Sequence, residues 1–254
     1  MFISINYKNG SIKNTLTSLI LFVNEKFDIS KIKRYFSSSD YSMVSDLLKV
    51  RDLKKKILCF EVSSKRKILL VSINKNTTSS DIENLGAKFH DLCKDFKRND
   101  YFLISDTLSV QQKNLVGNFL HGLKLKSYKF EKYKTNKNKK TISINVIGKN
   151  KPSNNDQLKF KAIEEGTFYT RDLVSEPGNI LHPDEYAKRL KSLKKFGLKI
   201  NVYDQKKLKK LGMNTLLGVG QGSIRGSYLV TLEWSGLKDK SKPLAFVGKG
   251  VCFD

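Results

Sequence analysis

The chain has 254 residues, of which 39% are hydrophobic and 10% aromatic, a length and composition that fit one or two folded domains and exclude a disordered polar chain. No apolar run reaches the roughly 18 residues of a membrane span, so no membrane-spanning helix is expected. The 48 Lys and Arg against 24 Asp and Glu leave a formal net charge of +24, which favours contact with nucleic acid or another acidic surface.

The positive charge has a second interpretation. Lysine, asparagine, serine and isoleucine are enriched together along the whole chain, which fits a general residue bias that only solvates the surface. We favour this interpretation because no predicted helix concentrates the charge on one face with interleaved aromatic residues.

The N-terminus lacks the charged and then apolar order of a secretory signal. The three cysteines, Cys59, Cys93 and Cys252, have no paired spacing and are interpreted as reduced thiols. We therefore expect a cytoplasmic protein.

The first 150 residues alternate between short apolar runs and helical patterns. Strands are predicted at residues 3–7, 19–23, 57–62, 68–73, 101–104 and 142–147. A helix follows Ser80 and Glu83, which stand at the spacing of a capping box, and its apolar stripe continues to Phe96. A second helix is predicted at residues 110–123. This alternation predicts an α/β domain with a largely parallel or mixed sheet.

Residues 149–156 have the composition of a linker, so we predict an N-terminal domain at 1–150, a linker at 151–156 and a second part at 157–254. The second part is again α/β. Its predicted helices cover residues 156–173, a segment from Pro183 to Gly197, and a short stretch between Asp204 and Gly212. Its predicted strands are residues 198–203, 228–234 and 244–247.

The last predicted strand runs into Gly248-Lys249-Gly250, and Asp254 follows five residues after the lysine. Ligands of open α/β sheets sit beyond the carboxyl ends of strands, and a carboxylate is a suitable oxygen ligand for a divalent metal. A lysine ligates a metal only as a neutral amine. From spacing alone, a glycine turn with a solvated lysine and aspartate is the favoured interpretation.

Two further stretches carry weaker signals. Residues 218–226 match the first two glycines of a dinucleotide-binding loop, but Ser223 stands at the third, so a flexible connection between a helix and a strand is favoured. Residues 171–179 contain a Pro-Gly turn signal between two helices. His90, His121 and His182 are isolated, and we assign no catalytic residue.

Taken together, these stretches resemble the leucyl (cytosol) aminopeptidase family in order and spacing. The resemblance runs through Arg-Asp-Leu-Val at 171–174, Pro177, Asn179 and Pro183, Leu-Gly-Met at 211–213, Gly-Val-Gly-Gln-Gly-Ser at 218–223 and Val-Gly-Lys-Gly-Val-Cys-Phe-Asp at 247–254. Upstream, residues 122–130 and 133–135 resemble the end of the family's N-terminal domain. The similarity covers roughly half of the chain.

The resemblance implies a metal-dependent aminopeptidase that removes N-terminal residues, often leucine, from peptides. It implies a homohexamer with two Mn or Zn ions per subunit, an N-terminal α/β domain like a macro domain, and an α/β metallopeptidase domain that carries the site. Lys249 would ligate one metal and Asp254 would bridge both.

The sequence departs from the family at Cys252, where a small hydroxyl or apolar residue is usual, and at Ser175, where asparagine is usual. The family's other metal ligands, its second lysine and its arginine would lie after Asp254. We therefore expect an incomplete catalytic domain, a truncated product or fragment, that holds metal weakly and is inactive as it stands. The alternative hypothesis is a non-catalytic basic α/β module that binds nucleic acid or a protein partner.

Overall fold

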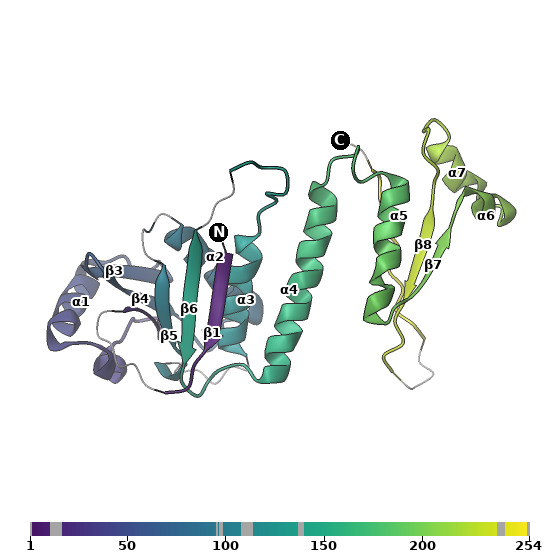
Figure 1. Ribbon diagram of the computed structural model, residues 1–254. Helices are drawn as coiled ribbons and strands as arrows, with labels where there is room; N and C mark the ends of the chain where they lie inside the picture. The colour runs from purple at the N-terminus through teal and green to yellow at the C-terminus, as the bar shows by residue number, and fades with distance from the viewer. Residues whose placement is uncertain are drawn as a thin grey trace. The chain divides into compact units, whose positions relative to one another are not determined.

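The computed structural model describes residues 2–10, 17–94, 96, 99–107, 114–136, 140–237 and 242–252. The chain divides into two compact units, Met1–Thr170 and Arg171–Asp254, whose common boundary lies inside the long helix α4 (Asn154–Ser175) of Figure 1. The domain limits expected from the sequence, 1–150 and 157–254 with a linker at 151–156, stay a prediction. Among the described residues, no helix combines the length and the apolar character needed to cross a membrane.

Unit 1 is built on a six-stranded sheet in the order β1-β6-β5-β2-β4-β3. The strands are β1 (Phe2–Tyr7), β2 (Ser18–Val23), β3 (Ile57–Ser63), β4 (Arg66–Ser72), β5 (Asp100–Ile104) and β6 (Thr141–Ile147). Only the β3–β4 pair is antiparallel; the other neighbours run parallel. The predicted α/β class with a mixed, largely parallel sheet is confirmed.

The central strand β2 is buried along its whole length because both faces of the sheet are covered. Ile20 and Phe22 point to one face and pack with α2 (Ser79–Cys93) and α3 (Leu115–Ser127). Leu19 and Leu21 point to the other face and pack with the 3₁₀ helix η1 (Ser30–Tyr35) and α1 (Ser38–Val50). Because side chains alternate between the two faces of a strand, β2 contributes residues to two separate hydrophobic cores.

Two details of the helices in unit 1 differ from the sequence prediction. The capping box of α2 is formed by Thr78 and Asp81, so the prediction of Ser80 and Glu83 is wrong: the helix begins two residues earlier. Helix α1 was not predicted, although Ser37 caps it by accepting a hydrogen bond from the Asp40 backbone at 3.1 Å. The first residues of the predicted helix 110–123 lie outside the described residues.

A buried histidine lies in the core of unit 1. His90 on α2 is only 5% exposed, and neither of its ring nitrogens has a hydrogen-bond partner. Burial lowers the pKa of His90 below its ordinary value of 6.5, and this outweighs the opposing effect of Asp91, while Lys126 adds to the lowering. The folded state therefore holds His90 neutral at pH values where the unfolded chain binds a proton.

Unit 1 is expected to lose stability as the pH falls below about 6.5, because His90 binds a proton in the unfolded state but stays neutral in the folded state. The free energy of unfolding falls by at most about 1.4 kcal/mol per pH unit because of His90. The loss levels off below the pKa that His90 has in the folded state. Urea unfolding of the wild type and of His90→Leu at pH 7.5 and 5.5 measures it. Equal losses of stability in both proteins would show that His90 is not responsible.

Unit 2 combines the end of α4 with short helices around a two-stranded antiparallel sheet. Its other elements are α5 (Pro183–Lys191), η3 (Ser192–Phe196), β7 (Lys199–Tyr203), α6 (Gln205–Lys210), α7 (Asn214–Gly220) and β8 (Leu229–Glu233). Pro183 occupies the first turn of α5, Asp204 caps α6, and Gly197 closes η3 with a φ of 86°. These three helix-end predictions agree with the structure.

The predicted strand at residues 244–247 is wrong. These residues have no strand pairing, and Leu244, Phe246 and Val247 are 82%, 89% and 98% exposed. An apolar run becomes a strand only where a neighbouring strand takes up its backbone hydrogen bonds, and in unit 2 the described strands β7 and β8 pair with each other. The result is an exposed apolar segment that leads into the glycine–lysine motif.

Candidate functional site: the Lys249 turn and helix α5

Lys249 lies in the described segment 242–252, which has no regular secondary structure, and it is exposed. It follows the apolar residues 244–247 after Gly248, as the sequence analysis expected, but these residues form an irregular segment and not a strand. Asp254, the second candidate metal ligand, lies outside the described residues. Both residues stay predicted ligands.

The two glycines beside Lys249 have different surroundings. A Cβ atom added at Gly250 would lie 2.7 Å from Cε1 of the Tyr186 ring on α5, whereas one added at Gly248 would meet nothing within 4 Å. The Gly250 backbone therefore packs directly on an aromatic ring, and a side chain added there would have to displace that ring. This contact joins the Lys249 turn to helix α5.

The N-terminus of α5 is fixed by a group of polar contacts. His182 caps the helix by accepting a hydrogen bond from the Glu185 backbone at 3.4 Å. The Tyr228 hydroxyl, at the start of the sequence that forms β8, donates a hydrogen bond to Asp184 at 2.7 Å, and Arg225 approaches the same carboxylate at 3.5 Å. The Tyr228 hydrogen bond holds the pKa of Asp184 below its usual range and raises the pKa of Tyr228.

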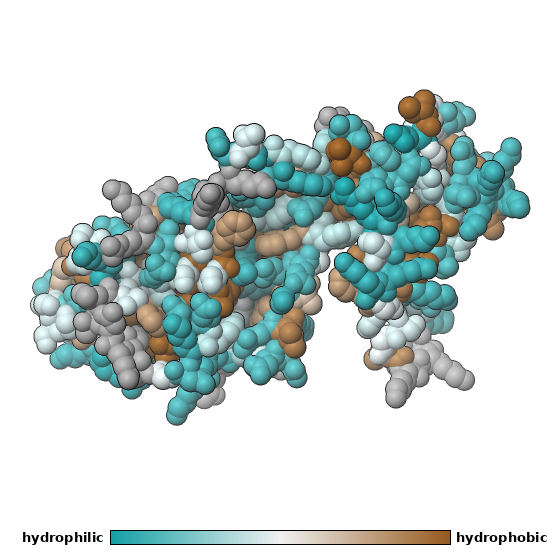
Figure 2. Space-filling view, in the orientation of Figure 1, coloured by the Kyte–Doolittle hydropathy of each residue, from teal (hydrophilic) through white to brown (hydrophobic). Residues whose placement is uncertain are grey.

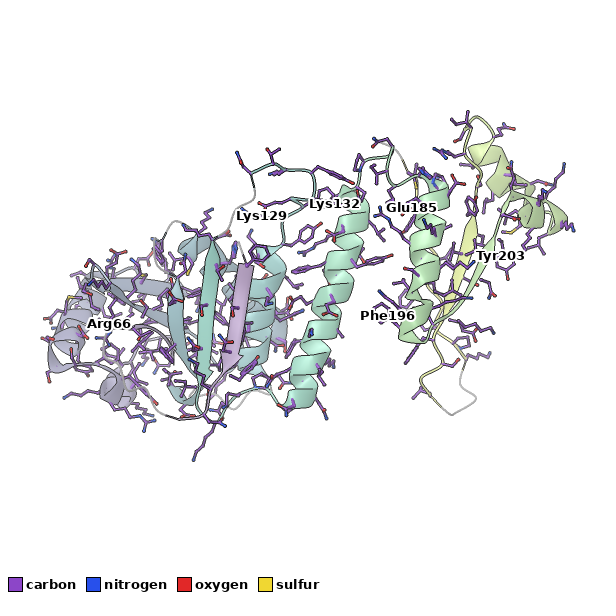
Figure 3. All side chains as sticks on the ribbon, in the orientation of Figure 1. Arg66, Lys129, Lys132, Glu185, Phe196 and Tyr203 are labelled. Carbon is purple, nitrogen blue, oxygen red and sulfur yellow. The ribbon has the colours of Figure 1, made fainter. Side chains whose placement is uncertain are left out.

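A second set of contacts ties α5 to the turn that precedes it. Arg189 donates hydrogen bonds to Glu176 and to Glu185, each at 3.0 Å, and the carboxylate of Glu176 is buried. Figure 3 shows Glu185 at the end of α5 where the chain enters from this turn. The hydrogen bond from Arg189 lowers the pKa of Glu185. Residues 171–179 thus form the end of α4 and a turn that is anchored to α5.

The glycine-rich stretch 218–226 also has a structural position. Gly218 and Gly220 belong to the last turn of α7, and the following residues lead to β8. A Cβ atom at Gly220 would lie 2.1 Å from the Ser227 hydroxyl oxygen, so this glycine permits a close approach within the connection. The predicted helix-to-strand connection is present, but its first residues are helical.

The three histidines occupy separate places in the fold. His90 and His121 are buried on α2 and α3, where His121 contacts Glu83 through Nδ1 at 2.9 Å, and His182 caps α5. Over the residues that the structure describes, no group of three or more His, Cys, Asp or Glu side chains could hold a metal ion. These residues therefore do not form a metal centre by themselves; the amine of Lys249 and the carboxylate of Asp254 suit a divalent metal only as part of a larger ligand set.

Comparison with known proteins shows which family part of the chain resembles. Residues 168–254 match the catalytic domain of the cytosol aminopeptidase family. The probable cytosol aminopeptidases of Brucella anthropi and of Phytoplasma mali are each 44% identical to this chain over 161 residues, which cover 58% and 60% of the chain. Over the matched residues, the chain is similar to the cytosol aminopeptidase family. It spans about a third of the length of these curated relatives, 32% of each.

Solved structures show the same fold at lower sequence identity. A mutant of tomato leucine aminopeptidase has a TM-score of 0.69 at 18% identity, and the similarity covers 90% of this chain and 50% of that one. The cytosol aminopeptidase of Coxiella burnetii has a TM-score of 0.64 at 17% identity, covering 91% and 47%. A bottromycin maturation enzyme in complex with Mn has a TM-score of 0.63 at 17% identity, covering 87% and 45%.

Similarity to a peptidase family bears on the alternative hypothesis of a nucleic-acid-binding or partner-binding module, which the comparisons do not support. On the face shown in Figure 2, hydrophilic side chains are spread over both units. The aminopeptidase family therefore explains the motifs, and the net charge of +24 fits a general residue bias.

Proposed function

We propose that this chain contributes to the catalytic domain of a metal-dependent aminopeptidase that releases N-terminal amino acids, leucine among them, from peptides. The match of residues 168–254 to the catalytic domain of the cytosol aminopeptidase family carries the proposal. That match includes the whole motif from Val247 to Asp254, the part of the sequence whose residue types suit metal ligation.

Within this function, Lys249 and Asp254 are proposed as metal ligands. The metals are two divalent ions, Mn or Zn, and a similar solved enzyme is described in complex with Mn. Paired metals would polarise the peptide carbonyl and lower the pKa of a bound water. The chain's own contribution is to hold the Lys249 amine at the surface of unit 2, on a turn packed against α5.

The proposed partners follow from the family. Peptides are the proposed substrates, and a homohexamer is the proposed assembly. We propose the cytoplasm as the compartment, in keeping with the cytosol aminopeptidase relatives.

The chain of 254 residues is expected to bind Mn²⁺ weakly, with a dissociation constant above about 100 µM, because two ligands from one loop leave most coordination positions to water. Calorimetric titration with Mn²⁺ measures the affinity, and Lys249→Ala should abolish the weak binding. A site in the micromolar range that is lost on Asp254→Ala would contradict this expectation.

The function itself is tested in a chimera. This chain replaces the matched part of the Phytoplasma mali relative and is followed by the remainder of that relative's sequence. With Mn²⁺ added, the chimera is expected to hydrolyse a chromogenic leucine amide, and a chelator should stop the reaction. A folded chimera with no rate above the protein-free blank would refute the proposed function.

A further inference from the structure

We propose that Tyr186 is a positioning residue for the turn Gly248-Lys249-Gly250, and that its ring fixes the turn so that Lys249 is presented in one orientation. The inference deepens the proposed function and rests on it only for the role of Lys249. The contact itself is a property of the described structure.

The first step is the asymmetry between the two glycines. Gly250 would bring a side chain within 2.7 Å of Cε1, 3.5 Å of Cδ1 and 3.7 Å of Cζ of Tyr186, whereas Gly248 has open space. Neither glycine belongs to the positive-φ glycines of the described chain, so neither is needed for an unusual backbone conformation. The absence of a side chain at Gly250 therefore serves the close approach of the Tyr186 ring.

The second step is the surroundings of the turn. Val247 before it and Val251 after it are 98% and 59% exposed, and segment 242–252 has no strand or helix. Such a segment is expected to move on a fast timescale unless a packed contact restrains it. Tyr186, which is half-buried, provides a contact of that kind one residue from Lys249.

The third step is the rigidity of the platform. Tyr186 lies in the first turns of α5, between Glu185, which is bonded to Arg189, and Ala187, which is 6% exposed. Asp184 joins the same turn to Tyr228, and Arg189 joins the helix to buried Glu176. The ring is therefore carried by a helix that is anchored on two sides. A residue on an anchored helix can hold a loop in place, because ordering the loop costs no further ordering of the helix.

The test uses the intact chain of 254 residues, uniformly labelled with ¹⁵N, and follows the NMR order parameter of Gly250 without metal. The wild type and Tyr186→Phe are expected to give values near 0.8, because Phe keeps the ring atoms that touch Gly250, and Tyr186→Ala is expected to fall below about 0.6. Unchanged order in Tyr186→Ala would overturn the proposal.

A matched pair of glycine variants tests the contact between Gly250 and Tyr186 without changing the sequence of α5. Gly250→Ala should displace the ring and lower the order of Lys249 and Val251, whereas Gly248→Ala, which adds the same methyl group in open space, should leave both unchanged. Equal effects of the two substitutions would also overturn the proposal. This pair decides the question even if Tyr186→Ala does not fold.

A Mn²⁺ titration of the same samples separates the two hypotheses. Broadening of the Gly248 and Gly250 signals should need roughly fivefold more Mn²⁺ in Tyr186→Ala than in the wild type and in Tyr186→Phe. If the wild type shows no broadening while the order parameters change as expected, Tyr186 positions the segment, and Lys249 does not bind Mn²⁺ in this chain alone.

Discussion

Replacing Gly122 of α3 by alanine is expected to prevent unit 1 from folding stably. A Cβ atom at Gly122 would lie 1.9 Å from the Glu83 carbonyl oxygen of α2, and one at Gly86 would lie 1.9 Å from the Phe119 carbonyl oxygen of α3. The two helices thus meet backbone to backbone at two reciprocal points, and a helix backbone cannot turn aside as a side chain can. Overpacking at such a contact is expected to cost at least about 3 kcal/mol.

The α2–α3 contact lies over the hydrophobic core of the sheet. Phe119 and Phe89 pack against each other there with ring centroids 5.6 Å apart, and Phe119 also packs edge-on against Phe22 of β2 at 5.6 Å. Moving the helices apart to admit a methyl group would open these aromatic contacts, so the cost extends beyond the single clash.

Gly166→Ala is the matched control, because Gly166 also lies inside a helix, α4, but has nothing within 4 Å of an added Cβ atom. It is expected to be neutral or to stabilise the chain by about 0.5–1 kcal/mol through helix propensity. Urea unfolding followed by circular dichroism compares the two variants. A stability of Gly122→Ala within 1 kcal/mol of the wild type would mean that the helices are not packed as described.

Much of the fold of unit 1 could be predicted, because its signals are local. Apolar runs such as residues 19–23 are long enough for one buried strand, and the apolar stripe from Ile82 to Phe89 has helical spacing. The order of the strands could not be predicted, since β1 pairs with β6 across more than a hundred residues and only the packed sheet decides this. Helix α1 was missed, although Tyr41, Val44 and Leu48 stand at helical spacing after the Ser37 cap.

The candidate site was only partly predictable. Lys249 was found through the resemblance of its motif, but the sequence placed it after a strand, because an apolar run does not reveal whether a neighbouring strand exists to pair with it. Tyr186 lies in the helix predicted from Pro183, and nothing in the sequence marks it as part of the site. Its contact with Gly250 joins residues that are 64 positions apart in the sequence (250 − 186 = 64). A glycine in the sequence does not show which side chain packs against it in the fold.

Lys249→Ala is expected to lower kcat/KM of the chimera at least about 100-fold, because the loss of a metal ligand removes several kcal/mol of transition-state stabilisation. Lys249→Arg should be as inactive, since a guanidinium keeps the positive charge but does not lose its proton and cannot ligate a metal. The two variants together show whether activity requires a metal-ligating amine at position 249 or only a positive charge there.

Lys242→Ala is the matched control for charge, because Lys242 is another exposed lysine at the start of the same described segment and lies outside the motif. Its kcat/KM should stay within about threefold of the unmodified chimera, as expected for an isolated surface charge. Metal content measured on the purified proteins supplies a second readout: both Lys249 variants should retain less Mn than the Lys242 variant at the same free metal concentration. If Lys249→Arg keeps most of the activity, Lys249 acts through its charge, and its assignment as a metal ligand is wrong.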